Sequence, residues 1–199
     1  MQKKIVVHMY LKNGKAVTGF DGKELLEDGD VMSIAQHYSN NGADELLIFD
    51  LSDDDADHEQ SLNLIRQISR VIDIPMSGGG HIKNLEDVKK LLYAGCQQVF
   101  LNYAKAANIE LTEEVSKRFG KEKIAICTDS FAQLQANKAR VNEYTSRVIL
   151  LCDEVDVRTT ARLVEVPVLP VSTRADRHGL LKLLMLDNIC GVCGDTFSD

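Results

Sequence analysis

The chain has no tryptophan, only three prolines and no long apolar run. Pro75, Pro167 and Pro170 are isolated, and no segment rich in proline, glycine or serine divides the 199 residues. We therefore expect residues 1–199 to form a single domain. A membrane-spanning helix needs roughly 18 consecutive apolar residues, and the first residues lack the apolar centre of a signal peptide. These absences predict a cytoplasmic protein that does not enter a membrane.

Positive charge is also scarce relative to negative charge. The chain has 23 lysines and arginines against 30 aspartates and glutamates, a formal net charge of −7. An excess of negative charge repels phosphodiester backbones and anionic lipid surfaces. The composition therefore argues against a nucleic-acid-binding protein, while the 44% of hydrophobic residues is enough for one sizeable core.

The five cysteines do not indicate a disulfide framework, because their number is odd and they lie in or beside apolar runs. Cys190 and Cys193 have the C-x-x-C spacing, but on an expected strand positions three apart face opposite sides. We interpret both as buried thiols rather than as a redox or zinc pair. The acidic run at 53–57 is typical of a helix cap more than of a cation site. We expect no metal and no cofactor.

Strand-like and helix-like runs alternate along the chain. Strands are expected at residues 4–10, 45–51, 72–76, 98–102, 123–128, 147–153, 167–171 and 189–192. Helices are expected at residues 31–41, 58–71, 85–94, 112–119, 131–144, 157–163 and 177–187. Continuous apolar strands are typical of a parallel sheet that is buried on both faces. The alternation predicts an α/β fold, a (β/α)8 TIM-type barrel, with a doubly wound open sheet as the alternative.

An internal repeat favours the barrel and predicts that it consists of two similar halves. Asp73-Ile74-Pro75 recurs as Glu165-Val166-Pro167, an offset of 92, and Leu47–Asp50 is echoed by Leu150–Asp153. The second half is shortened, and only Thr196–Asp199 follow the last expected strand, so a clear eighth helix is lacking. We expect the apolar surface over strands 8 and 1 to be covered by a second copy or by a C-terminal domain.

Three consecutive glycines, Gly78, Gly79 and Gly80, join an expected strand to an expected helix. Glycine has no Cβ, so such a turn can expose backbone N–H groups to an oxyanion. The helix that follows adds the positive end of its dipole. This strand–turn–helix unit is suited to binding a phosphate group.

Further motifs accompany the glycine turn, namely Lys12–Val17, Gly42–Leu46 with Asp50, Asp73–Ile82, Leu101, Asn102 and Ala104, and Asp129. In these segments the chain resembles the HisA/HisF family of histidine biosynthesis, and is most similar to the cyclase subunit of imidazole glycerol phosphate synthase. The resemblance is strong over residues 1–130 and faint over 131–199. Members are (β/α)8 barrels of duplicated halves, and barrels of this kind can precede other histidine-pathway domains. We therefore expect the N-terminal module of a longer protein.

The resemblance implies a phosphate site at the ends of strands 3 and 4. Its expected residues are Gly78, Gly79, Gly80 and Asn102, with Tyr103 where the family has threonine. A second phosphate site, after strands 7 and 8, is expected to be lost. The segment Pro170–Ala175 contains no glycine, and Asp195 brings a carboxylate to that position.

The resemblance also implies that the catalytic pair is broken. Members use one aspartate after strand 1 and one after strand 5 as general acid and base. Asp129 matches the second, but Tyr10 stands at the first, and a phenol with a pKa near ~10 replaces a carboxylate poorly. Asp50 is a further residue at the barrel mouth. We interpret the chain as a catalytically degenerate barrel, a pseudoenzyme that binds one phosphate group or acts as a scaffold or regulatory module. The alternative is an active lyase or isomerase on a phosphorylated ribotide that uses Asp129.

Overall fold

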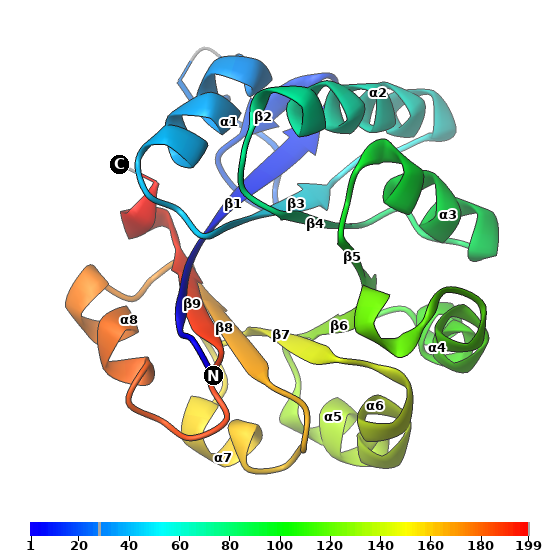
Figure 1. Ribbon diagram of the computed structural model, residues 1–199, viewed down its shortest axis with the longest axis vertical. Helices are drawn as coiled ribbons and strands as arrows, with labels where there is room; N and C mark the ends of the chain where they lie inside the picture. The colour runs from blue at the N-terminus through cyan, green and yellow to red at the C-terminus, as the bar shows by residue number, and fades with distance from the viewer. Residues whose placement is uncertain (28, 199) are drawn as a thin grey trace.

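The computed structural model describes residues 1–27 and 29–198, which form a closed barrel of parallel strands inside a ring of helices (Figure 1). The first and last barrel strands lie side by side, and β1 pairs with β9 from Lys4↔Gly191 to Val6↔Cys193. This closure confirms the (β/α)8 TIM-type barrel and excludes the open sheet. In order around the barrel, the strands are β1 (Lys4–Lys12), β3 (Glu45–Asp50), β4 (Met76–Gly79), β5 (Gln98–Asn102), β6 (Ile124–Thr128), β7 (Arg147–Leu151), β8 (Val168–Ser172) and β9 (Gly191–Gly194).

One additional strand, β2 (Lys15–Val17), forms an antiparallel hairpin with the end of β1. Its two-residue turn is Asn13-Gly14, and both residues have positive φ angles, 51° and 72°. Asn-Gly is the favoured sequence for such a turn. The sequence interpretation missed this hairpin, although its turn signal is present in the chain.

The helices pack on the outside of the strands (Figure 1). They are α1 (Val31–Asn40), α2 (Asp55–Val71), α3 (Leu85–Ala94), α4 (Ala106–Phe119), α5 (Phe131–Ala136), α6 (Lys138–Tyr144), α7 (Val157–Ala161) and α8 (Arg177–Leu183). A short 3-10 helix, η1 (Lys121–Lys123), precedes β6.

Within the described residues, β9 is followed only by the 3-10 helix η2 (Asp195–Phe197), which lies between α1 and α8 in Figure 1. From the sequence we expect a second copy or a C-terminal domain to cover the apolar surface over the first and last strands, but in the described residues part of that surface is already covered by the chain itself. Met9 and Val192 are completely buried. Phe197 of η2 packs on the outer core, and the side chain of Leu180 of α8 lies close to Gly194 of β9.

Several boundaries differ from the sequence expectations. β4 begins at Met76, since Ile72 still caps α2. α4 begins at Ala106 rather than Thr112. The helix expected at 131–144 breaks at Asn137 into α5 and α6.

The core has two parts. Leu46, Ile48 and Leu101 belong to the outer layer, which fills the space between the strands and the helices. A smaller cluster fills the barrel interior and includes Tyr10 and Phe49. The interior is therefore a packed core and not a pore. All five cysteines are free.

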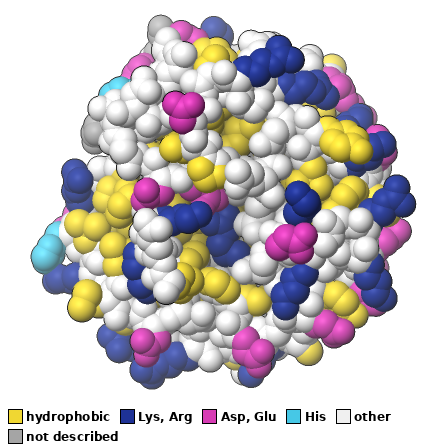
Figure 2. All heavy atoms as spheres, in the orientation of Figure 1, with side chains coloured by type: hydrophobic (Ala, Val, Ile, Leu, Met, Phe, Trp, Pro, Cys, Tyr) yellow, Lys and Arg dark blue, Asp and Glu magenta, His cyan; other side chains and the backbone are white. Residues whose placement is uncertain are grey.

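Charge is distributed without a dominant patch on the face shown in Figure 2, where basic and acidic side chains are interspersed. Among the described residues, no helix combines the length and the apolarity needed to cross a membrane.

Candidate functional site

A cavity of about 430 Å³ opens at the carboxyl ends of β3, β4, β5 and β6. Active sites of (β/α)8 barrels lie at this end of the strands. Five of the residues predicted from the sequence line the cavity: Asp50, Gly79, Gly80, Asn102 and Asp129. Tyr10, Gly78 and Tyr103 are not part of its lining.

The glycine turn after β4 can be formed only by residues without a side chain. A Cβ at Gly79 would collide with the ring of Phe100, and a Cβ at Gly80 would collide with the carbonyl oxygen of Asp50. Gly80 also has a φ of 103°, which other residues rarely adopt. Gly78 has a different role, because its Cβ position faces Cys96 and Leu91 and so allows close packing against the helix layer.

The second wall of the cavity is the segment from Asn102 to the start of α4. The side-chain oxygen of Asn102 accepts a hydrogen bond from the N–H of Ala104 at 3.0 Å. Lys105 is the N-cap of α4 but makes no side-chain cap bond, and its side chain lines the cavity. The start of α4 therefore brings a lysine and the positive end of the helix dipole to this wall.

Tyr103 points away from the cavity into the layer between β5 and α4. Its hydroxyl lies 2.7 Å from Thr112 Oγ1, its side chain is completely buried, and burial raises its pKa. Neighbouring residues at a strand end face opposite sides, which explains why Asn102 and Ala104 line the cavity and Tyr103 does not.

Tyr10 is buried within a group of aromatic rings. Its ring centroid lies 4.7 Å from that of Phe20 and 5.4 Å from that of Phe49. Its hydroxyl is buried and has no hydrogen-bond partner among the described residues. Burial, and secondarily the charge of Asp195, raise its pKa above the usual value. The phenol of Tyr10 therefore stays protonated at neutral pH.

Three aspartates line the cavity, and they differ in their contacts. Asp53 pairs with Lys12 at 3.1 Å. Asp129 is exposed at the end of β6 and makes no hydrogen bond or ion pair within the part of the chain that the structure describes. Asp50 is buried, accepts a hydrogen bond from the N–H of Ser52 at 3.0 Å, and places Oδ2 2.5 Å from Nδ1 of His58. Asp50 is therefore already engaged by its own loop and by α2.

His81 joins the glycine turn to the start of α2. Its ring stacks on His58 with centroids 4.6 Å apart, and its Nε2 lies 2.8 Å from Oδ1 of Asp55. Hydrogen bonds from His81 and Lys83 lower the pKa of Asp55 to about 2. The sequence interpretation missed the role of both histidines, because their partners lie on other elements.

The acidic run at 53–57 contains the cap of α2, as expected. The Asp54 side chain accepts a hydrogen bond from the N–H of Asp57 at 2.8 Å. In residues 1–27 and 29–198, no group of three or more histidine, cysteine, aspartate or glutamate side chains is arranged to hold a metal ion.

Asp195, the carboxylate expected near a second phosphate site, contacts His8 instead. Its Oδ1 lies 2.5 Å from Nε2 of His8, and Nδ1 of His8 lies 3.1 Å from Sγ of Cys193. Cys193 is completely buried, and burial raises the pKa of its thiol well above the usual value. The contacts of His8 with Cys193 and Asp195 therefore join β1 to β9 and to the residue that follows it. Burial keeps the thiol of Cys193 protonated.

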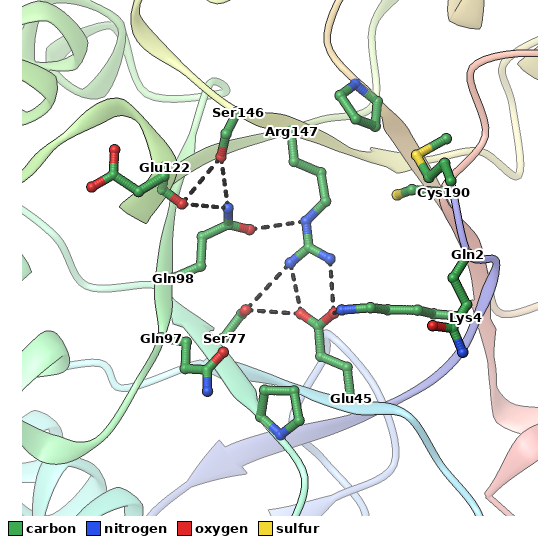
Figure 3. Close-up of a pocket in the computed structure, with 13 residues that line it drawn as sticks. Gln2, Lys4, Glu45, Ser77, Gln97, Gln98, Glu122, Ser146, Arg147 and Cys190 are labelled. Carbon is green, nitrogen blue, oxygen red and sulfur yellow. Dashed lines mark hydrogen bonds and ion pairs between the residues drawn. The ribbon is translucent and has the colours of Figure 1, made fainter.

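A second cavity, of about 310 Å³, lies at the opposite end of the barrel (Figure 3). Its centre is an ion pair in which Arg147 of β7 donates to both carboxylate oxygens of Glu45 of β3, at 2.7 and 2.9 Å. Ser77 donates to Glu45 at 2.8 Å, and Arg147 Nε donates to Gln98 at 2.9 Å. Although burial opposes both charges, these bonds lower the pKa of Glu45 and raise that of Arg147. The polar groups satisfy one another and tie the strands together.

Comparison with known proteins supports the resemblance. The sequence model of a family described as histidine biosynthesis protein matches residues 4–187. A protein of Flavobacterium psychrophilum named imidazole glycerol phosphate synthase subunit HisF is 33% identical over 130 residues, which is 65% of this chain and 52% of that protein. The protein of the same name from Haemophilus influenzae is 32% identical over 162 residues, 80% of this chain and 60% of its own length. The chain thus spans little more than half the length of these curated relatives.

Proposed function

The chain belongs to the histidine biosynthesis protein family, and we propose that it binds a phosphorylated small molecule at the carboxyl end of the barrel and lacks cyclase and isomerase activity. In this proposal the barrel acts as a binding, scaffolding or regulatory module. The cavity beside the glycine turn is the binding site.

Three features support a phosphate group at this position. Gly79 and Gly80 bring bare backbone to the cavity wall. The start of α4 contributes a favourable dipole for an anion. Lys105 adds a positive charge at the same wall. Groups of these three kinds are those that proteins use for phosphate oxygens.

One observation supports the proposed loss of catalysis: the hydroxyl of Tyr10 is buried and has no hydrogen-bond partner among the described residues. The acid–base pair that the family resemblance implies needs two groups that can exchange protons near the operating pH. Asp129 could supply one, but Tyr10 is held protonated and Asp50 is engaged by His58. The cavity therefore offers one uncommitted carboxylate.

A titration of the purified chain with ribose 5-phosphate tests the binding. We expect saturable binding in the parent and roughly three- to tenfold weaker binding in Lys105→Gln, because a charge-assisted contact is removed. Lys138→Gln, which removes an exposed lysine from the start of α6, is the matched control and should bind as the parent does. Equal affinity in all three proteins would contradict the proposal.

The alternative is an enzyme that uses Asp129, which is favoured by the position of this carboxylate in the cavity lining. Turnover of a phosphorylated ribotide by the parent, lost in Asp129→Asn, would establish the alternative. Binding of ribose 5-phosphate with no turnover in either protein is the result that we expect.

The relatives are named as subunits, which favours a partner chain or a further domain for this barrel as well. We propose such a partner. The cytoplasm remains the expected location.

A further inference from the structure

The turn after β8 is the counterpart, in the second half of the barrel, of the glycine turn after β4. Leu46 pairs with Met76 in the first half, and Val148 pairs with Val168 in the second. The carbonyl groups of Pro75 and Pro167 accept the matching backbone bonds, at 3.0 and 2.9 Å. The offset of 92 between the two prolines places Ser172 and Thr173 at the positions of Gly80 and His81.

The same pairing corrects the sequence repeat around Asp153. Leu46 and Val148 are equivalent in the strand register, so Cys152 takes the place of Asp50 and Asp153 follows one residue later. The carboxylate in the second half is therefore displaced by one residue relative to Asp50, and the two side chains contact different partners.

Asp153 reaches across to the turn after β8. The hydroxyl of Ser172 donates to its Oδ1, and Thr173 donates to its Oδ2 through the N–H, at 3.2 Å, and through the hydroxyl, at 2.8 Å. Burial alone would raise the pKa of Asp153, but these hydrogen bonds hold it below the usual value. A backbone N–H and two hydroxyl groups converging on two anionic oxygens are the donors that a phosphate group would use.

In the described residues of the first half, by contrast, the carboxylate of Asp50 makes no hydrogen bond to the glycine turn after β4. Asp50 contacts Ser52 and His58, and Gly79 and Gly80 remain in the cavity wall. In the second half the remaining donors are also satisfied internally. Ser172 Oγ accepts hydrogen bonds from the N–H groups of Arg174 and Ala175, at 3.2 and 2.9 Å, and the guanidinium of Arg174 pairs with Glu154.

We propose that the Asp153 carboxylate occupies the anion-binding position of the turn after β8 and so restricts the barrel to ligands with one phosphate group. This inference rests on the proposed function, because it specifies the ligand class of that site. A second phosphate group would have to displace Asp153 and would be repelled by it at short range.

Amide NMR spectra and calorimetric titrations of the parent and of Asp153→Ala test this inference. In the parent, inorganic phosphate should not shift the Thr173 amide, and ribose 5-phosphate and fructose 1,6-bisphosphate should bind within about threefold of each other. In Asp153→Ala, phosphate should shift the Thr173 amide, and the bisphosphate should gain roughly tenfold in affinity while ribose 5-phosphate changes less than twofold. Asp187→Ala, which removes the same charge between α8 and β9, is the control and should behave as the parent does.

The outcomes separate this inference from the proposed function. An unmoved Thr173 amide and an unchanged affinity ratio in Asp153→Ala would overturn the inference alone, provided that ribose 5-phosphate still binds. If ribose 5-phosphate does not bind the parent but phosphate shifts Thr173 in the variant, the proposed function fails and the assignment of Asp153 stands. If ribose 5-phosphate does not bind the parent and phosphate does not shift the Thr173 amide in Asp153→Ala, both the proposed function and the inference are refuted. Asp153→Asn, which keeps the shape and removes the charge, replaces Asp153→Ala if that protein does not fold.

Discussion

The ring of Tyr10 lies against the ring of Phe49, with the centroids 5.4 Å apart and an angle of 28° between the planes. The two residues lie on the neighbouring strands β1 and β3 and are opposite each other in the register. The position at the end of β1 is therefore part of the aromatic packing that closes the barrel interior. The tyrosine contributes its ring, while its hydroxyl has no partner in the described part of the chain.

Tyr10→Phe should be as stable as the parent or more stable, by up to about 1 kcal/mol, because it removes an unsatisfied buried hydroxyl. Tyr10→Asp should lose about 3 kcal/mol or more, since it buries a carboxylate and leaves a void beside Phe49. Urea denaturation followed by circular dichroism measures both changes. A loss above 1 kcal/mol in Tyr10→Phe would mean that the hydroxyl has a partner after all.

Removing one partner of the ion pair between Glu45 and Arg147 should destabilise the barrel strongly. Arg147→Met leaves the Glu45 carboxylate buried without its bidentate partner, and we expect a loss of about 3–5 kcal/mol. The double variant Glu45→Met with Arg147→Met should recover much of this loss, because no buried charge remains. Chemical denaturation of the parent, of Glu45→Met, of Arg147→Met and of the double variant tests the pair. A loss in the double variant equal to the sum of the two single losses would contradict it.

The same ion pair predicts part of the acid sensitivity of the protein. The pKa of Glu45 is lowered from its usual 4.5 in the folded chain, so its contribution to stability is complete above that value and is lost as the pH falls through the folded pKa. Glu45→Gln should therefore show a flatter decline of unfolding free energy below about pH 4.5. Glu165→Gln, an exposed carboxylate, should retain the slope of the parent.

Two glycine substitutions should differ sharply in effect. Gly80→Ala places a Cβ against the carbonyl group of Asp50 at a φ of 103°, and we expect a loss of about 2–5 kcal/mol from backbone strain and overpacking. Gly19→Ala has no heavy atom within 4 Å of the new Cβ and should be nearly neutral. Thermal melts of the two variants compare them directly, and similar melting temperatures would contradict the assigned geometry.

The carboxyl group of Asp55 should titrate at an unusually low pH. Hydrogen bonds from His81 and Lys83 lower its pKa to about 2. In His81→Ala the pKa should move back toward the usual 3.8, because the larger of these bonds is lost. Carbon-detected NMR titration of the side-chain carboxyl measures both values. An unchanged pKa in the variant would show that His81 does not contact Asp55 in solution.

The sequence predicted best those features that have a local cause. Helix α3 was expected at the residues where it is found, because Asn84 and Asp87 form a capping box and Gly95 ends the helix with a φ of 118°. The start of α4 was missed, since Lys105 gives no cap signal. The glycine turn was recognised for a similar reason, as its three residues are consecutive.

The features that the sequence did not predict depend on contacts between distant residues. The pairs Asp50–His58 and Asp153–Ser172 depend on how a loop turns after a strand, which no short motif encodes. The direction of Tyr103 depends on strand register, because a shift of one residue would have turned it into the cavity.

The ion pair between Glu45 and Arg147 also has a consequence for the order of folding. It joins β3 of the first half to β7 of the second, across 102 positions of chain. Neither half alone can complete this pair. A half-barrel formed early would leave Arg147 without its carboxylate, and Glu45 with only Ser77 at 2.8 Å and Lys4 at 3.7 Å. Folding of the two halves should therefore be coupled. The ion pair between them, a contact between residues far apart in the sequence, should form slowly and late in folding. The two halves, although similar in sequence, should unfold as one cooperative unit.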